Sequence, residues 1–234
     1  MHLRTLIPVA LAAGCNIHSG GNSDQAFVSA TWQLGDLESG DPIACPSGFP
    51  IAALVTQPLD DTSGLASGAA TTTQFPCDDG EGTSAPLTPA SYDTALAIQS
   101  SDGTVWATSV HQTLDMHEVD QAFATILYDD AGYFHLTWTL VGAVSGSTLD
   151  CGVISIDGIE LASTSATATA DNLFECELGS AYTPAIVAGT YDVEIGAETG
   201  GTHDGTYANL ANLEITTPNQ VTELGAVMIS IDGQ

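Results

Sequence analysis

Two stretches of the chain decide its fold: Thr31-Trp32-Gln33-Leu34 and, further along, Thr137-Trp138-Thr139-Leu140. Each is followed by a cysteine, then by a second cysteine in a Phe-x-Cys context, and then by a Tyr-Asp pair. The spacings from Trp to the first cysteine, and from the second cysteine to Tyr, are the same in both series. Only the segments between these anchor points differ in length, as loops would. The sequence therefore predicts a tandem duplication with one pair of cysteines in each copy.

Both copies contain runs with the period of a β-strand. In Tyr133–Leu140, for example, every second residue is a large apolar residue on one face, and Tyr92–Ile98 and Tyr191–Ile195 alternate in the same way. The remaining expected strands are 27–34, 123–128 and 226–231. Ala162–Ala170 is small and Thr-rich, closer to a loop or an edge strand, and no amphipathic helix is evident. This pattern predicts an all-β chain of two tandem Ig-like or transthyretin-like antiparallel β-sandwich domains.

The first residues carry the features of an export signal. A short apolar run follows Arg4 and ends in Ala12-Ala13-Gly14-Cys15. A cysteine directly after glycine resembles a bacterial lipobox, which implies that Cys15 is diacylated and becomes the first residue of the mature chain. An ordinary secretory signal cleaved near Ala13 is the alternative. The predicted organisation is a signal peptide (1–14), a polar tether (15–25), and two sandwich repeats (26–131 and 132–234). The linker at Asp129–Gly132 is short, which predicts a stubby rod.

Removing Cys15 from the five cysteines leaves four, two for each copy. Four cysteines allow three connectivities, and the equivalent positions favour Cys45–Cys77 and Cys151–Cys176. Each bridge would close a loop and stabilise the fold by about 3–4 kcal/mol in the chain-entropy picture. We further expect both tryptophans of the repeat to fill the core and both tyrosines, Tyr92 and Tyr191, to hydrogen-bond near a corner.

The charge is extreme. Arg4 is the only Lys or Arg residue, against 29 Asp and Glu residues, all of which follow Cys15. Nucleic acid is excluded as a partner, because phosphate neutralisation requires Lys or Arg. Only histidine can serve as an internal cation. Mobile cations screen repulsion between unpaired carboxylates, so the composition suits a salty, extracellular environment and predicts halotolerance.

A resemblance follows from these residues. The order of Gly-Cys, polar tether, Trp-x-Leu, Cys, Phe-x-Cys and Ala-Gly-Thr-Tyr-Asp-Val resembles small repeat-containing surface lipoproteins of myxobacteria. Val187–Val193 is also similar to the Gly-x-Tyr strand of carboxypeptidase-regulatory-like and Cna B-type sandwiches. The resemblance implies an Ig-like or transthyretin-like fold at the cell surface and carries over no catalytic residue. The lysine of Cna B-type isopeptide bonds has no counterpart here.

Few motifs indicate chemistry. His117-Glu118-Val119-Asp120-Gln121 lacks the second histidine of a zinc-binding HExxH helix. Gly80–Ala85 fits a loose dinucleotide pattern, but the prolines that follow prevent the helix that should hold pyrophosphate. Asp78, Asp79 and Glu81 lie in a glycine-rich loop whose oxygen atoms could bind Ca²⁺, with a solvated turn as the plainer interpretation. Further acidic pairs are Asp60-Asp61 and Asp129-Asp130, and the histidines at 111, 117 and 135 are expected near the junction or singly exposed.

The sequence thus favours a lipid-anchored, non-enzymatic protein of the bacterial cell envelope, held to the membrane by acyl chains on Cys15. It would act as a spacer or bind a protein or glycan ligand. Loops that differ between the copies, such as Pro58–Gln74, are the places to expect binding. A Ca²⁺-dependent adhesion module is one alternative. A secreted hydrolase is another, and it would be distinguished by a pocket that brings His, Ser and Asp within hydrogen-bond reach of one another.

Overall fold

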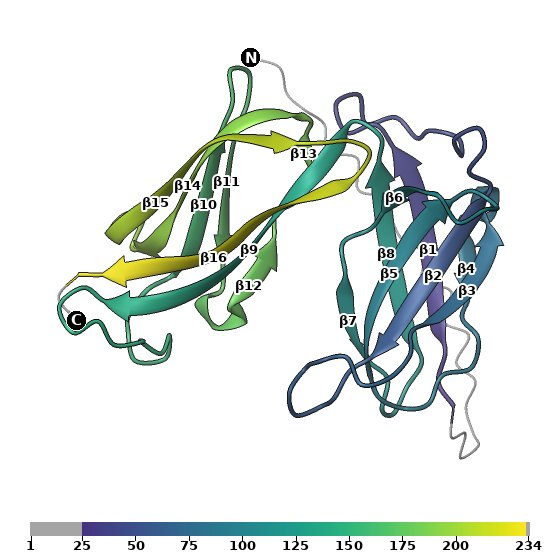
Figure 1. Ribbon diagram of the computed structural model, residues 1–234, viewed down its shortest axis with the longest axis horizontal. Helices are drawn as coiled ribbons and strands as arrows, with labels where there is room; N and C mark the ends of the chain where they lie inside the picture. The colour runs from purple at the N-terminus through teal and green to yellow at the C-terminus, as the bar shows by residue number, and fades with distance from the viewer. Residues whose placement is uncertain (1–24, 233–234) are drawn as a thin grey trace.

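A computed structural model describes residues 25–232 (Figure 1). The predicted signal peptide, the lipidation residue Cys15 and nearly all of the tether lie outside these residues. Within the described part the chain is built of strands and has no α-helix, only two short 3₁₀-helices. No helix there is long and apolar enough to cross a membrane. The all-β fold class predicted from the sequence is confirmed.

The first half forms two sheets. One has the order β4-β1-β8 and the other the order β3-β2-β5-β6, with β7 also pairing β5. Their bounds are β1 Val28–Gly35, β2 Ile51–Pro58, β3 Thr71–Pro76, η1 Cys77–Asp79, β4 Glu81–Thr83, β5 Ser91–Gln99, β6 Val105–Thr108, β7 Gln112–Asp115 and β8 Gln121–Tyr128. Buried side chains of both sheets meet in one core that includes Trp32, Leu54, Leu96 and Phe123.

The second half repeats this plan. One sheet has the order β12-β9-β13 with β16 alongside β9, and the other has the order β11-β10-β14-β15. Their bounds are β9 Ala131–Gly142, β10 Gly158–Thr164, β11 Thr169–Phe174, η2 Cys176–Leu178, β12 Ser180–Tyr182, β13 Ile186–Val187, β14 Gly189–Thr199, β15 Thr202–Ile215 and β16 Gln220–Ile231. A second core includes Phe134, Trp138, Leu161 and Ile195.

Two details differ from the sequence predictions. The first and last strands of each half, β1 with β8 and β9 with β16, run parallel within otherwise antiparallel pairings. A parallel pair needs a crossover, which here includes the whole opposite sheet of that half. Ala162–Ala170 was expected as loop or edge strand, but its first residues belong to β10, a strand paired on both sides. Leu161 and Ser163 of β10 are fully buried. Their neighbours on the outer face are small residues, so the sequence alone does not reveal this burial.

The repeated aromatic residues hold the same positions in both halves. The indole Nε1 of Trp32 donates to the carbonyl of Cys77 over 2.9 Å, and that of Trp138 donates to Cys176 over 3.0 Å. The hydroxyls of Tyr92 and Tyr191 each donate over 2.8 Å to the carbonyl four residues earlier. All four side chains are buried. The predicted core tryptophans and corner tyrosines are confirmed, and the matching bonds show that one scaffold is used twice.

Both expected disulfides are present, Cys45–Cys77 and Cys151–Cys176. Their Cα atoms lie 6.1 and 5.8 Å apart, within the usual range for a bridge. The second cysteine of each pair opens the 3₁₀-helix that leads to the short edge strand. Each bridge therefore ties the segment after the first strand to the start of that turn.

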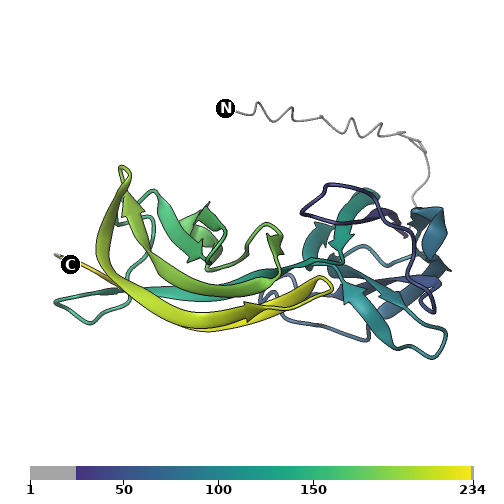
Figure 2. The same ribbon diagram turned by 90° about the horizontal axis from the view of Figure 1, so that it is seen from above.

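The two halves lie end to end, as Figure 2 shows along the long axis. The linker is shorter than predicted, because β9 already begins at Ala131. Asn219, 2% exposed, crosses the junction: its Oδ1 accepts the Tyr128 N–H over 2.9 Å and its Nδ2 donates to the Thr108 carbonyl over 2.7 Å. From the linker, Asp130 accepts the backbone N–H groups of Leu37 and Glu38 at 2.7 and 2.9 Å. These bonds fix one half against the other.

Candidate functional site

The structure leaves the predicted calcium ligands spread along an exposed turn. Asp78 and Asp79 lie in η1 and Glu81 begins β4, and all three side chains are exposed. Among the described residues, the only group of three acidic ligand atoms within 4.8 Å of one another is Asp36, Asp129 and Asp130. The carboxylate of Asp130 already accepts two backbone N–H groups there. Calcium binding at Asp78, Asp79 and Glu81 stays a prediction.

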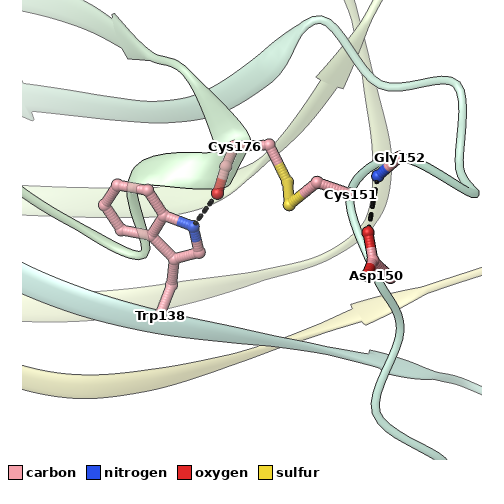
Figure 3. Close-up of a disulfide and its surroundings, with 5 residues drawn as sticks. All are labelled: Trp138, Asp150, Cys151, Gly152 and Cys176. Carbon is pink, nitrogen blue, oxygen red and sulfur yellow. Dashed lines mark hydrogen bonds between the residues drawn. A yellow bond between two sulfur atoms is a disulfide. The ribbon is translucent and has the colours of Figure 1, made fainter. Parts of the chain in front are cut away.

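Each half has a groove beside its disulfide. In the second half it has a volume of about 450 Å³ and is bordered by Trp138, Asp150, the Cys151–Cys176 bridge and Gly179. Figure 3 shows the indole of Trp138 donating to Cys176 on one side of the bridge, and Asp150 accepting the Gly152 N–H on the other. The corresponding groove of the first half, about 280 Å³, is bordered by Trp32 and Asp78. The grooves come from the shared scaffold.

The predicted binding loop is long only in the first half. The connection from β2 to β3 covers residues 59–70, whereas β10 and β11 are joined by a turn of four residues, 165–168. The predicted range Pro58–Gln74 therefore includes part of β3. One carboxylate oxygen of Asp60 accepts the N–H groups of Thr62 and Ser63, and Leu65 on this loop is 70% exposed.

The histidines do not gather at one place. His117 lies between two carboxylates, with Nδ1 2.7 Å from Asp115 and Nε2 3.0 Å from Asp61 of the long loop. Hydrogen bonds to Asp115 and then Asp61 raise its pKa above the ordinary value. His111 precedes β7 and His117 follows it, so about six residues of extended chain, or roughly 20 Å, separate them. His111 and His117 are both exposed and pair with different carboxylates, which fits the expectation of single exposed histidines and not that of a cluster.

His111 and His135 lie toward the junction instead. The Nδ1 atom of His111 is 2.7 Å from Asp93 of β5. In the second half, the Nδ1 atom of His135 on β9 is 2.6 Å from the Glu223 carboxylate on β16, and its Nε2 is 2.9 Å from the Ser180 hydroxyl on β12. Three side chains from three adjacent strands thus form one row of hydrogen bonds.

Sequence reasoning missed this row. Ser180 and Glu223 lie 45 and 88 positions from His135, and no local motif joins them. The detectable signal is the comparison of the two copies. The sheet registers align His135, Ser180 and Glu223 with Ser29, Glu81 and Ala122 of the first half. All three positions have changed, while the tryptophan and the cysteines around them have not.

Comparison with known proteins adds little to this geometry. No protein-family model matches the chain, and no curated protein sequence matches it. Among solved structures it is similar to a leucine-rich repeat protein from Bacteroides thetaiotaomicron, with 12% identity over 90% of this chain and 27% of that chain, and a TM-score of 0.38. A candidate polysaccharide binding protein from the same species gives 7% identity, 80% coverage of both chains and a TM-score of 0.30. A streptococcal ancillary pilin gives 10% identity, 88% and 63% coverage, and a TM-score of 0.27. At TM-scores this low, none of these likenesses assigns a function.

Proposed function

We propose that the chain is a lipid-anchored protein of the bacterial cell envelope, in which two sandwiches form a stiff spacer that presents a binding surface. The observation that carries the proposal is the junction. A two-residue linker, the buried Asn219 and Asp130 join the halves. The side chains of Asn219 and Asp130 bond to backbone groups of the first half, and the Ala188 N–H of the second half donates to the Asp130 carbonyl over 2.8 Å. Because the two halves are fixed against each other, the second half keeps a constant position relative to the first and does not swing freely.

The disulfides support export. One bridge in each half is typical of proteins that fold in an oxidising compartment, because cytosolic thiols are kept reduced. The strongly acidic surface fits the same setting, since the described residues contain no Lys or Arg that could pair with it. Attachment would come from acyl chains on Cys15.

The anchor is tested by growing cells that express the full chain with an alkyne-labelled fatty acid. We expect the wild-type chain to carry the label and sediment with membranes, and Cys15→Ser to carry none and remain in the soluble fraction. Equal labelling of the two chains, or none in either, would exclude lipid on Cys15. Ser23→Ala, which also lies before the first sandwich, serves as the control and should label normally.

For the binding surface we propose the β2–β3 loop, with a protein or glycan as ligand. The turn of this loop at Asp60 is held by hydrogen bonds, Asp61 of the loop is paired with His117, and Leu65 is exposed to solvent. An ordered loop with an exposed apolar side chain loses less entropy on binding than a floppy one. Leu65→Ser should weaken retention of the purified chain on intact cells, and Leu178→Ser, which alters a leucine of the second half that is 59% exposed, should not. Equal retention of both variants and the wild type would rule the loop out.

A further inference from the structure

In the row of hydrogen bonds formed by Ser180, His135 and Glu223, the positions of the protons follow from elementary chemistry. A carboxylate only accepts hydrogen bonds, so the imidazole must donate from Nδ1 to Glu223 across their 2.6 Å contact. In the neutral ring Nε2 is then the acceptor, and the Ser180 hydroxyl donates to it over 2.9 Å. This is the arrangement in which an imidazole can remove a proton from a serine.

The scaffold does not require this row of hydrogen bonds. The equivalent strands β1, β4 and β8 of the first half pair in the same registers with Ser29, Glu81 and Ala122 at these positions. They form their sheet and core without an imidazole. The row in the second half is therefore an addition to a fold that is complete without it.

Its surroundings hold the imidazole in place. The ring of Tyr182 stacks on His135, with centroids 4.3 Å apart and planes inclined by 24°. Burial raises the pKa of the Tyr182 phenol, and the negative charges of Glu223 and Asp93 add to the effect, so the stacked ring stays neutral. The side chain of His135 is only 18% exposed, whereas that of Glu223 is 64% exposed. The imidazole is thus covered on one face and aimed at the serine.

Ser180 is reachable from outside. In the described residues β12 pairs with β9 alone, and it forms the edge of its sheet. Gly179 and Thr183 both bond to β9, so the alternation of the ladder directs the Ser180 N–H to the open side of β12. A backbone donor therefore lies beside the hydroxyl, as oxyanion stabilisation requires.

We infer that Ser180 is a nucleophile that accepts acyl groups from carboxylic esters, with His135 as its general base. The Oγ–carbonyl bond forms as the Ser180 proton moves to Nε2 of His135. The bond to the leaving alcohol then breaks, and that alcohol takes the proton. Water then attacks the acyl carbon and gives its proton to Nε2; the bond between the acyl carbon and Oγ breaks, the acid leaves, and the proton on Nε2 returns to Oγ. The sum is ester plus water giving acid plus alcohol, with no other reactant. Glu223 is a positioning residue that holds the Nδ1–H.

The test treats the purified full chain with a fluorophosphonate and, separately, with p-nitrophenyl acetate. We expect one phosphonyl adduct on Ser180 by peptide mass spectrometry and ester turnover that Ser180→Ala abolishes. His135→Asn should slow both reactions by about 10²-fold or more, the usual contribution of a general base. Ser100→Ala is the matched control, because Ser100 donates its hydroxyl to the carboxylate of Asp102 without an imidazole, and it should change nothing.

Glu223→Gln separates positioning from structure. We expect kcat to fall about tenfold or more with little change in KM, because the carboxylate touches only the base. A purely structural role would lower Tm and leave the kcat of the folded fraction unchanged. No adduct on the wild-type chain, an adduct elsewhere than Ser180, or equal reaction of wild type and Ser180→Ala would overturn the proposal. Fatty-acid labelling of Cys15 does not depend on Ser180, so the two proposals fail separately.

Discussion

Replacing Asn219 with glycine is expected to loosen the junction between the two halves. The side chain of Asn219 supplies an acceptor to the Tyr128 N–H and a donor to the Thr108 carbonyl, and it is 2% exposed. Its backbone has φ 49°, a left-handed conformation that glycine adopts without strain. The substitution therefore removes the two side-chain bonds and leaves the turn intact.

The free-energy cost of the substitution follows from the Tyr128 N–H and the Thr108 carbonyl, which both lose their hydrogen-bond partner. An unsatisfied buried N–H or C=O costs about 1–3 kcal/mol, so the two together cost roughly 2–6 kcal/mol, less whatever water regains on entering. At ~1.4 kcal/mol for each factor of ten, opening of the junction becomes roughly 30- to 20,000-fold more frequent before any recovery by water. Hydrogen exchange of the Tyr128 amide reports on this opening directly, because its N–H is the donor to Asn219.

Asn212→Gly is the matched control. Asn212 has φ 57° but is exposed, and it takes part through its backbone N–H, which donates to Asp192 over 3.0 Å. We expect this variant to leave the Tyr128 exchange rate within about threefold of wild type, since surface substitutions usually cost less than about 0.5 kcal/mol. If Asn219→Gly also stayed within that range, the junction would be held by other contacts, and the reasoning above would be refuted.

Three further predictions test the fold and its charges. Gly196→Ala would place a Cβ 2.2 Å from the Tyr207 ring, whereas at Gly35 the nearest atom is 3.6 Å away; urea unfolding should show a loss of about 1–3 kcal/mol for Gly196→Ala, as overpacking gives, and almost none for Gly35→Ala. The pKa of His117 is raised and those of Asp61 and Asp115 are lowered, with the mutual hydrogen bonds as the first cause in each case. Their contribution to the stability of the loop is therefore complete between the ordinary values of 3.8 and 6.5, is lost as pH rises through the higher pKa of His117, and is lost again in acid below 3.8. The protection of amides in residues 59–70, measured as the exchange rate relative to the intrinsic rate at the same pH, should be greatest in that window, and His117→Asn should remove this maximum. Thermal melting in 50 mM and 1 M NaCl should give a higher Tm at the higher salt, because the Debye length falls to ~3 Å at 1 M, and an unchanged Tm would contradict the role of screening.

The scaffold could be predicted because its signals are local. Alternation along Tyr133–Leu140 reports which residues face the core, and the same Trp, Cys and Tyr spacing in two copies removes most alternative registers. The disulfide pairs follow from that repeat. Each of these features depends on residues that lie on one strand or at one corner, so a single sequence contains the information.

The junction and the serine row depend on register between strands that are distant in the sequence. His135 meets Glu223 because β9 and β16 run parallel, and a bulge shifts the register just beyond that pair. A slip by one residue would point Glu223 to the other face. Asn219 lies in a turn and belongs to no periodic pattern in the sequence. What the sequence does hold is the contrast between the copies at 29 and 135, which becomes informative only once the registers align them.

The placement of the serine row separates its chemistry from the junction. His135, Ser180 and Glu223 come from β9, β12 and β16 of one sheet, so their mutual geometry does not depend on the first half. Asp93 of the first half acts on Tyr182 only through its charge. Asn219→Gly should therefore leave the rate of Ser180 phosphonylation within about threefold of wild type, as expected for sites without shared partners. A much larger loss, with Tm unchanged, would show that the first half supplies part of the site and that the reactive surface spans both sandwiches.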